Sequence, residues 1–184
     1  DEAQWLIRIV ENLLSVTRIN GENAKINTED EVVEEIISSA VIKFSKRFPE
    51  APVEVKMPEE FLMVAMDGVL IEQVLVNLLE NAVLHGKTYT KIWIIVTHTP
   101  GRVEIAVEDD GQGIKESVLP VMFEGKISSD EEESDSKRNM GIGLSVCHSI
   151  VKAHKGGMHA ENRAEGGARI SFWLPMNEED TDGY

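Results

Sequence analysis

The apolar run VLIEQVLVNLLENAVLHG, residues 69–86, constrains the fold more than any other segment of the chain. Its hydrophobicity predicts a buried helix. The run nevertheless carries Asn77 and Asn81, which lie four residues apart and therefore share one helical face. Asparagine is a poor helix former and costs free energy when it is buried without hydrogen-bond partners. The two amides thus indicate that this face has a special use.

Composition narrows the functions that such a helix can serve. The chain has 184 residues, of which 42% are hydrophobic, which predicts one domain of ordinary size with a substantial core. The net charge of −15 argues against binding of nucleic acid or anionic lipid through bulk electrostatics. It leaves open an anionic ligand that is held by backbone amides or a metal ion.

Cysteine content and hydropathy exclude further classes of protein, namely those built on disulfides, cysteine-bound metals or membrane spans. Cys147 is the sole cysteine of the sequence, so neither an intrachain disulfide nor a cysteine-based metal site can form. No run of 18 apolar residues is present, so no membrane span is predicted. The acidic start DEAQWLIRIV is unlike a secretory signal, and we expect it to be a cut through a longer protein.

The first twenty residues have the spacing of an amphipathic helix that ends at the turn Asn20-Gly21. We expect its apolar stripe to pack on the main domain or on a partner helix. The stripe consists of Trp5, Leu6, Ile9, Val10, Leu13, Leu14, Val16 and Ile19.

The next segment predicts a short strand near 23–27 and then a helix at 29–47, because Thr28 and Glu31 have capping-box spacing. VEVKMP (53–58) and FLMVAM (61–66) are expected to pair across a Pro-Glu-Glu turn. Asp67 is the predicted N-cap of the apolar helix.

Alternating residues at 91–99 and 102–109 predict a hairpin around Pro100-Gly101. Residues 115–140 contain the acidic run SSDEEESDSK and are expected to be a mobile loop. Gly141 is expected to open a helix that stops at Gly156-Gly157, followed by strands at 158–163 and 167–175. These elements predict an α+β domain, with a mixed sheet and helices packed on one face, preceded by one helix.

Two glycine-rich spots join the asparagine face as candidates for chemistry, and together they suggest a nucleotide site. Gly141 and Gly143 at a helix start would let backbone N–H groups and the helix dipole meet a phosphate. Asp109, at a strand end, could accept a hydrogen bond from an exocyclic amine such as that of adenine. Gly111 and Gly113 would leave room for a flat ring.

Asn81 offers a neutral oxygen suited to a hydrated Mg²⁺ that bridges phosphates. Each motif alone has an ordinary explanation, which is a turn, a helix cap or a satisfied core amide. Their order and spacing along one chain are much more specific than any of them singly.

At this point the chain resembles the catalytic, ATP-binding half of sensor histidine kinases, of the GHKL superfamily. NLLENAVLHG matches the asparagine box of that family, VEDDGQGI its first glycine box, and MGIGLSVCHSIVKAHKGG its second glycine box. The closing strands and the first helix match as well, so the resemblance covers residues 1 to about 175, and it is nearest to Kdp-type sensors. It implies a two-layer α/β sandwich of the Bergerat type, with residues 1–21 as the end of a dimerisation-domain helix and linker, residues 22–176 as the catalytic domain, and residues 177–184 as a disordered tail.

The resemblance also implies roles for individual residues. Asn81 would be the Mg²⁺ ligand with Asn77 beside it, and Asp109 would read adenine with Gly111 and Gly113 behind the ring. The remaining implied nucleotide contacts lie at the lid and the phosphates, namely His85, Met122, Phe123, Gly141, Gly143 and Leu144.

Several positions depart from the family pattern. Leu84-His85 stands where the family often has Lys-Tyr, so a phosphate-contacting lysine is absent, and His85 is either a nucleotide contact or a cap. Lys126 replaces the second Phe of the lid motif, and Asn139 replaces a common glycine. With the acidic lid, these changes predict modest nucleotide affinity and a lid that a partner closes.

The residue type four positions before Asn81 distinguishes domains that transfer a phosphoryl group from domains that hydrolyse ATP. Related ATPases are similar in carrying there a Glu that activates water, whereas this chain has Asn77, so hydrolysis lacks its general base. Glu80 points about 100° away around the helix and is a poor substitute. The acceptor histidine of the family is expected in an upstream dimerisation domain outside this chain, since no histidine here sits in a matching motif.

The leading hypothesis is therefore an ATP- and Mg²⁺-binding domain that presents the γ-phosphate to that histidine for relay to a response regulator. The implied setting is a homodimeric sensor kinase, with this domain on the cytoplasmic side of a membrane anchor, and no nucleic-acid partner. An anti-sigma-type serine kinase on the same fold and a degenerate module that binds a partner without ATP remain alternatives.

Overall fold

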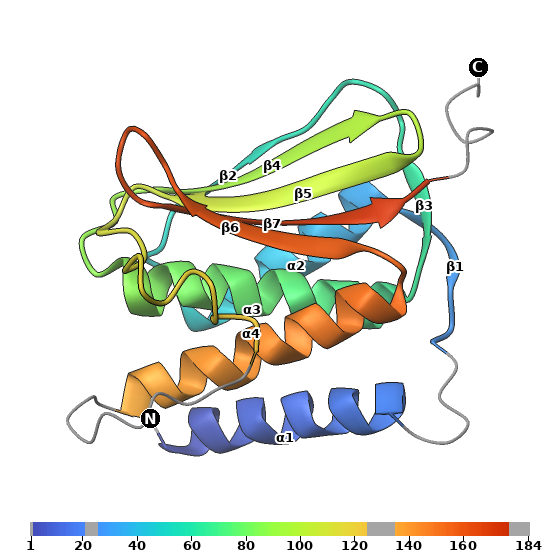
Figure 1. Ribbon diagram of the computed structural model, residues 1–184. Coiled ribbons are helices and arrows are strands. Elements are labelled where there is room, and N and C mark those ends of the chain that lie inside the picture. The colour runs from blue at the N-terminus through green and yellow to red at the C-terminus, as the bar shows by residue number, and fades with distance from the viewer. Residues whose placement is uncertain (1, 21–25, 125–134, 177–184) are drawn as a thin grey trace.

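One face of a five-stranded sheet is covered by helices in the computed structural model, which describes residues 2–20, 26–124 and 135–176 (Figure 1). The predictions for 125–134 and for the tail 177–184 lie outside the described residues. The helices are α1 (Glu2–Asn20), α2 (Val33–Arg47), α3 (Gly68–Gly86) and α4 (Asp135–Ala153). The strands are β1 (Glu29–Val32), β2 (Val53–Lys56), β3 (Met63–Met66), β4 (Ile92–Thr99), β5 (Arg102–Asp109), β6 (Gly157–Asn162) and β7 (Ala168–Pro175).

The main sheet has the order β2-β4-β5-β7-β6. β2 and β4 are parallel and the other neighbours are antiparallel, so the predicted mixed sheet is confirmed. The predicted β4–β5 hairpin is also confirmed, with Gly101 in the left-handed region at φ 84°. Its register pairs Ile92 with Asp109, which places Asp109 at the end of the central strand.

A separate two-stranded sheet corrects the expected start of the domain. β1 pairs with β3, whereas β2 pairs with β4, so the expected hairpin of 53–58 with 61–66 is wrong. β1 lies at 29–32, residues 26–28 have no regular structure, and the rest of the strand predicted near 23–27 lies outside the described residues. The helix begins at Val33 and not at residue 29. Pairing with β3 competes successfully with the capping-box spacing, and Val33 N–H donates to Leu62 O at 3.0 Å where the helix begins.

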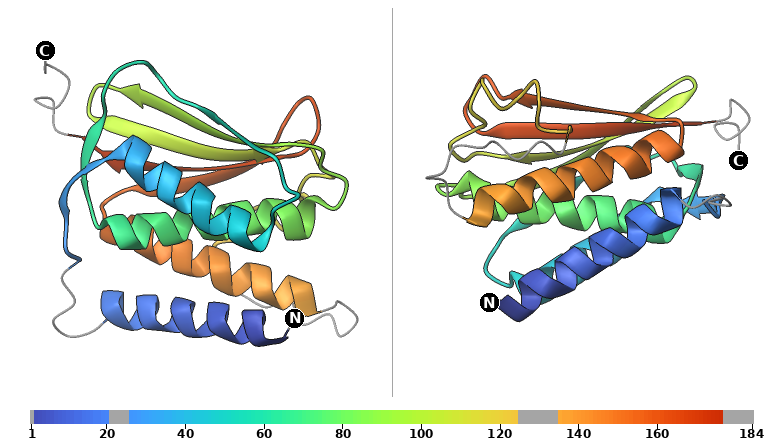
Figure 2. Two further views of the ribbon diagram at one scale, coloured as in Figure 1. Left: turned by 180° about the vertical axis from the view of Figure 1, so that it is seen from behind. Right: turned by 60° about the horizontal axis from the view of Figure 1, so that its bottom comes forward.

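Helix α3 is the centre of the core, as its apolar sequence predicts. It packs against α2 and α4 beneath the sheet (Figure 2). The Asp67 side chain accepts a hydrogen bond from Leu70 N–H at 3.2 Å. The predicted N-cap is therefore confirmed. The largest fully buried side chains of α3 are Leu70, Ile71, Leu75, Leu78 and Leu79.

Helix α4 starts earlier than expected. It begins at Asp135, so residues 135–140 are helical and Gly141 does not open the helix. The preceding stretch is rich in Asp and Ser, which favour helix N-termini, and two internal glycines cost only about 1 kcal/mol each. The predicted helix end is confirmed at Ala153.

Helix α1 forms as predicted, and two of its polar side chains face the domain, while Ile19 packs against the core. Asn12 and Ser15 are buried, and they bond to the α3 side chains Gln73 and Asn77. The apolar residues Leu6, Ile7, Val10, Leu13 and Leu14 are each at least half exposed. α1 contacts α4 on the side away from the sheet (Figure 1).

Candidate functional site

The predicted site residues gather at one end of the molecule, the left side of Figure 1. There the C-terminal end of α3, the end of β5, the segment 110–124 and the first half of α4 lie together. Gln112 joins two of these pieces, because its backbone N–H donates to Gly86 O at 3.1 Å and its side chain donates to His85 O at 2.9 Å. The end of α3 is thus fixed to the loop after β5.

Asp109 is a buried carboxylate at this junction, with 6% of its surface exposed. Burial raises the pKa of Asp109, while the N–H groups of Gly111 and Ala168 oppose that shift. Gly111 N–H reaches one carboxylate oxygen, Oδ1, at 2.8 Å. A buried, hydrogen-bonded carboxylate of this kind is suited to accept a further bond from a ligand donor.

The two glycines after Asp109 owe their identity to packing within the protein. A Cβ on Gly111 would overlap the carbonyl group of Gly86. Gly113 has φ 75°, and a Cβ there would lie 2.8 Å from Asn162 Oδ1. Close packing within the protein is thus one reason for these glycines, and their predicted role beside a flat ring stays a prediction.

The two asparagines of α3 differ in their surroundings. Asn77 Nδ2 donates to Asn12 Oδ1 at 3.3 Å and lies 3.6 Å from Cys147 Sγ, so its amide has protein partners. Asn81 Nδ2 is buried and has no hydrogen-bond partner among the described residues. Asn81 is therefore the amide whose burial calls for a ligand, and a nucleotide contact by Asn77 stays a prediction.

Met122 and Phe123, at the predicted start of the lid, pack on the core. Met122 is buried, and the Phe123 ring stacks on His148 of α4 with centroids 5.8 Å apart. Burial lowers the pKa of His148, which favours its neutral form. The first lid residues thus have a fixed platform, and their contact with a base stays a prediction.

The second glycine box lies inside α4. A Cβ on Gly143 would meet no atom within 4 Å, although the residue itself is buried, and Leu144 is fully buried in the core. The free N–H groups of a helix belong to its first turn, and Gly141 lies six residues beyond Asp135. The expected helix start at Gly141 is therefore corrected, and phosphate contacts by Gly141, Gly143 and Leu144 stay predictions.

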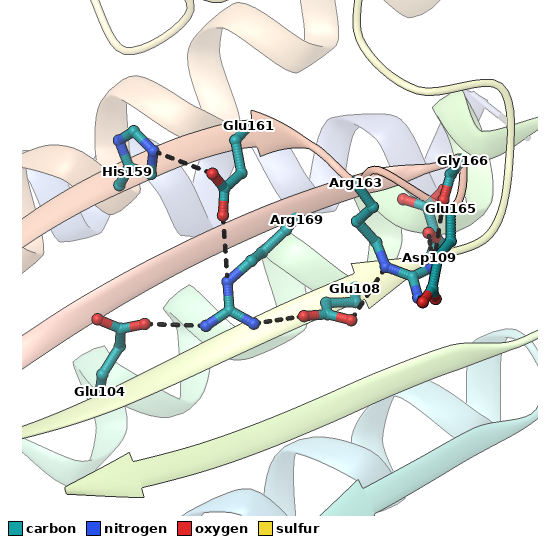
Figure 3. Close-up of polar contacts among 9 residues, drawn as sticks. All are labelled: Glu104, Glu108, Asp109, His159, Glu161, Arg163, Glu165, Gly166 and Arg169. Atoms are coloured by element: carbon teal, nitrogen blue, oxygen red, sulfur yellow. Dashed lines mark hydrogen bonds and ion pairs between the residues drawn. The ribbon is translucent and has the colours of Figure 1, made fainter.

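The sequence analysis missed two residues beside Asp109. Arg163 Nη1 donates to Asp109 O at 3.0 Å, and its Nε lies 3.1 Å from Glu108 Oε2 (Figure 3). Asn162 bonds to both backbone groups of Ile114. The available signal was an Asn-Arg pair just before the Gly166-Gly167 turn, but its meaning depends on which strand the turn meets.

Comparison with known protein families identifies the family of this chain. Residues 66–178 match the family described as histidine kinase-, DNA gyrase B- and HSP90-like ATPases. The chain belongs to this family. Within it the matches are to sensor histidine kinases, so the chain is an ATPase domain of the histidine-kinase type.

Two sensor proteins support this placement and confirm the Kdp-type resemblance. The ATPase domain is 43% identical to the sensor protein KdpD of Clostridium acetobutylicum over 95% of this chain. It is 33% identical to KdpD of Escherichia coli over 92% of this chain. In both cases the chain spans 19% of the length of the relative.

Solved structures show the same fold. The catalytic domain of histidine kinase ThkA is 25% identical, with a TM-score of 0.69, and the match covers 83% of this chain and 98% of that one. Full-length ShkA, solved in complex with AMPPNP, has a TM-score of 0.72 at 20% identity and covers 92% of this chain and 35% of that one, which shows the fold alone. The comparisons give no support to the serine-kinase alternative or to a degenerate module.

The described part of the ATPase domain holds neither a cluster of His, Cys, Asp or Glu side chains that could bind a metal nor a helix that could span a membrane. Within residues 2–20, 26–124 and 135–176, no group of three or more His, Cys, Asp or Glu side chains could hold a metal ion. No helix in those ranges is both long and apolar enough to cross a bilayer.

Proposed function

We propose that this domain binds Mg-ATP between the end of α3, the loop after β5 and the first half of α4. The observation that carries the proposal is the buried, unpartnered amide of Asn81 one turn before the residues that contact the Asp109 loop. The end of α3 lies against Asp109, since a Cβ on Gly86 would be 3.5 Å from Asp109 Oδ1. One buried amide and one buried carboxylate thus line the same end of the fold.

Each residue has a distinct role in this proposal. Asp109 accepts the exocyclic amine of adenine, and Asn81 faces the Mg²⁺ with its waters. Bound Mg²⁺ offsets phosphate charge, which matters in a chain of net charge −15. The lack of a side chain at Gly143 would let the triphosphate approach the backbone of α4. His85, Met122 and Phe123 complete the contacts, with the lid start shielding the base.

Phosphoryl transfer fits the residues around the site better than hydrolysis does. Glu80 is buried and pairs with Arg47 at 2.6 Å, so this carboxylate is already committed within the core. Asn77 lacks the basicity to activate water. The domain would therefore act by holding the γ-phosphate for attack by an imidazole from outside this chain, mainly through positioning and charge neutralisation.

The larger assembly follows from the same proposal. Residues 1–21 would end a dimerisation-domain helix, and residues 22–176 would be the catalytic domain of a homodimeric, membrane-anchored sensor kinase. The domain would lie on the cytoplasmic side and supply phosphate for a response regulator. ThkA, a solved histidine kinase of TM-score 0.71 over 97% of this chain, is in complex with the response regulator protein TrrA.

Calorimetric titration with ATP, with and without Mg²⁺, tests the proposal together with the variant Asp109→Asn. We expect Mg²⁺-assisted binding with a Kd between micromolar and millimolar. Because the variant loses a charge-assisted hydrogen bond, its affinity should fall by about tenfold or more. Glu104→Gln, which neutralises another carboxylate of β5, serves as the control. Unchanged binding by Asp109→Asn would remove the adenine assignment, and no binding by the unmodified chain would remove the function.

A further inference from the structure

The turn between β6 and β7 contacts the Asp109 loop from the side of the sheet. Asn162, the last residue of β6, makes two bonds to one residue of that loop. Its Oδ1 accepts from Ile114 N–H at 2.6 Å, and its Nδ2 donates to Ile114 O at 2.7 Å. A side chain that satisfies both backbone groups of one residue fixes the position and the rotation of that peptide.

Arg163 holds the other end of the loop. Its Nη1 donates to Asp109 O at 3.0 Å, and its Nε pairs with Glu108 Oε2 at 3.1 Å (Figure 3). The same guanidinium lies 5.0 Å from the centroid of the Trp93 ring. A planar fork that is held on several sides loses little freedom when it binds, so it is a rigid support.

The backbone of the turn completes the contact. Gly167 has φ 87°, and a Cβ there would overlap Asp109 O. Gly167 O accepts from Arg163 N–H at 3.0 Å, which closes the turn on itself. The Ala168 N–H group is one of those that stabilise the Asp109 carboxylate. The turn therefore touches the main chain of Asp109 as well as its charged group.

We propose that Asn162 and Arg163 are positioning residues that hold the two ends of the 109–114 loop, so that Asp109 meets the base in a fixed orientation. The inference rests on the proposed binding of ATP. Neither residue need touch the nucleotide, because each acts through the loop. A loop that is ordered before binding loses less entropy when the ligand arrives, and small errors in orientation weaken a directional hydrogen bond most.

A purely structural role makes a different prediction from a positioning role. If the two residues only stabilised the fold, their loss would lower the fraction of competent protein and weaken every nucleotide equally. If they orient Asp109, the loss should fall on ligands that offer an exocyclic amine. Inosine triphosphate has the same sugar and phosphates as ATP but lacks that amine, so it is the matched probe.

The experiment is calorimetry of the full chain with Mg-ATP and Mg-inosine triphosphate for Asn162→Ala, Arg163→Gln and Arg163→Lys. We expect ATP to bind about tenfold more weakly to the first two variants, while inosine triphosphate changes little. Arg163→Lys keeps the charge but not the fork, so it should resemble Arg163→Gln. Arg102→Gln is the control, because Arg102 also lies over a tryptophan ring, at the opposite end of β5.

The preference for ATP, which is the affinity for Mg-ATP divided by the affinity for Mg-inosine triphosphate, is the ratio that decides the outcome. A fall in that ratio for folded Asn162→Ala or Arg163→Gln, with Arg102→Gln unchanged, supports positioning. An unchanged ratio, including equal weakening of both nucleotides, overturns it. If one variant fails to give a cooperative thermal transition, the other and Arg163→Lys carry the test. An unmodified chain that binds both nucleotides equally overturns the adenine assignment and the positioning role with it, whereas one that binds neither overturns the proposed function.

Discussion

Single buried polar groups link the ends of the helices in this domain, and His154 is the clearest case. Its Nε2 accepts from Asp67 N–H at 2.9 Å, and its Nδ1 lies 2.8 Å from Ile150 O, which requires the neutral ring with the proton on Nδ1. Asp67 is the N-cap of α3, and His154 directly follows α4. One imidazole thus joins the end of α4 to the beginning of α3.

This arrangement predicts a dependence of stability on pH. Burial lowers the pKa of His154 below its usual value, so between that lowered pKa and about 6.5 the unfolded chain binds a proton that the folded chain does not. The contribution to stability is therefore complete above about pH 6.5 and is lost as the pH falls through the folded pKa. Urea unfolding between neutral pH and pH 5 should show this slope, and His154→Gln should reduce it.

The same variant should cost about 1–2 kcal/mol at neutral pH, because it disturbs two buried hydrogen bonds. His159→Gln on β6, where the ring is largely exposed, is the comparison variant. A slope as steep in His154→Gln as in the unmodified chain would show that other groups cause the acid sensitivity.

Secondary-structure elements behave differently according to how local their determinants are. The β4–β5 hairpin and the cap of α3 were predictable, because the turn residues and the N-cap lie next to the elements that they define. The pairings of β2 with β4 and of β1 with β3 join segments far apart in sequence, and no local signal specifies them. The contacts of Arg163 with Glu108 and Asp109 had no sequence signal for the same reason, since Arg163 acquires these partners only when β7 lies beside β5.

At the scale of helix α4, Gly143→Ala should separate stability from binding. The position is helical and a Cβ there would meet no atom within 4 Å, so alanine should stabilise the domain by roughly 0.5–1 kcal/mol. If the triphosphate approaches Gly143, the added methyl group should also weaken ATP binding. Chemical denaturation and calorimetry measure the two effects, with Ser149→Ala in the same helix as the control. Tighter folding with unchanged ATP affinity would place the phosphates elsewhere.

At the scale of the whole molecule, an apolar side of α1 is left uncovered by the rest of the domain. α1 places its polar side chains Asn12 and Ser15 against α3 and leaves Leu6, Leu13 and Leu14 more than half exposed. A helix whose apolar residues face outward is suited to pack on another helix. The sequence predicted this stripe correctly but left open which side the domain would take.

We expect the chain to self-associate through α1 in the micromolar range, as measured by sedimentation equilibrium. Leu6→Glu with Leu13→Glu places two charges on one side of the helix, seven residues apart, and should leave a monomer. Ile42→Glu provides the control, because Ile42 on α2 is equally exposed but lies outside the stripe. A monomer for the unmodified chain at high concentration would contradict the dimer.

The order of strands in the sheet also matters for synthesis. β7, the last strand in the part of the chain that the structure describes, lies between β5 and β6 and pairs with β5 along almost its whole length. A nascent polypeptide that still lacks β7 leaves the open edge of β5 and part of the apolar core exposed. The sheet can therefore be completed only after residue 175 has left the ribosome. We expect this domain to reach its final fold only when nearly all of it has been translated.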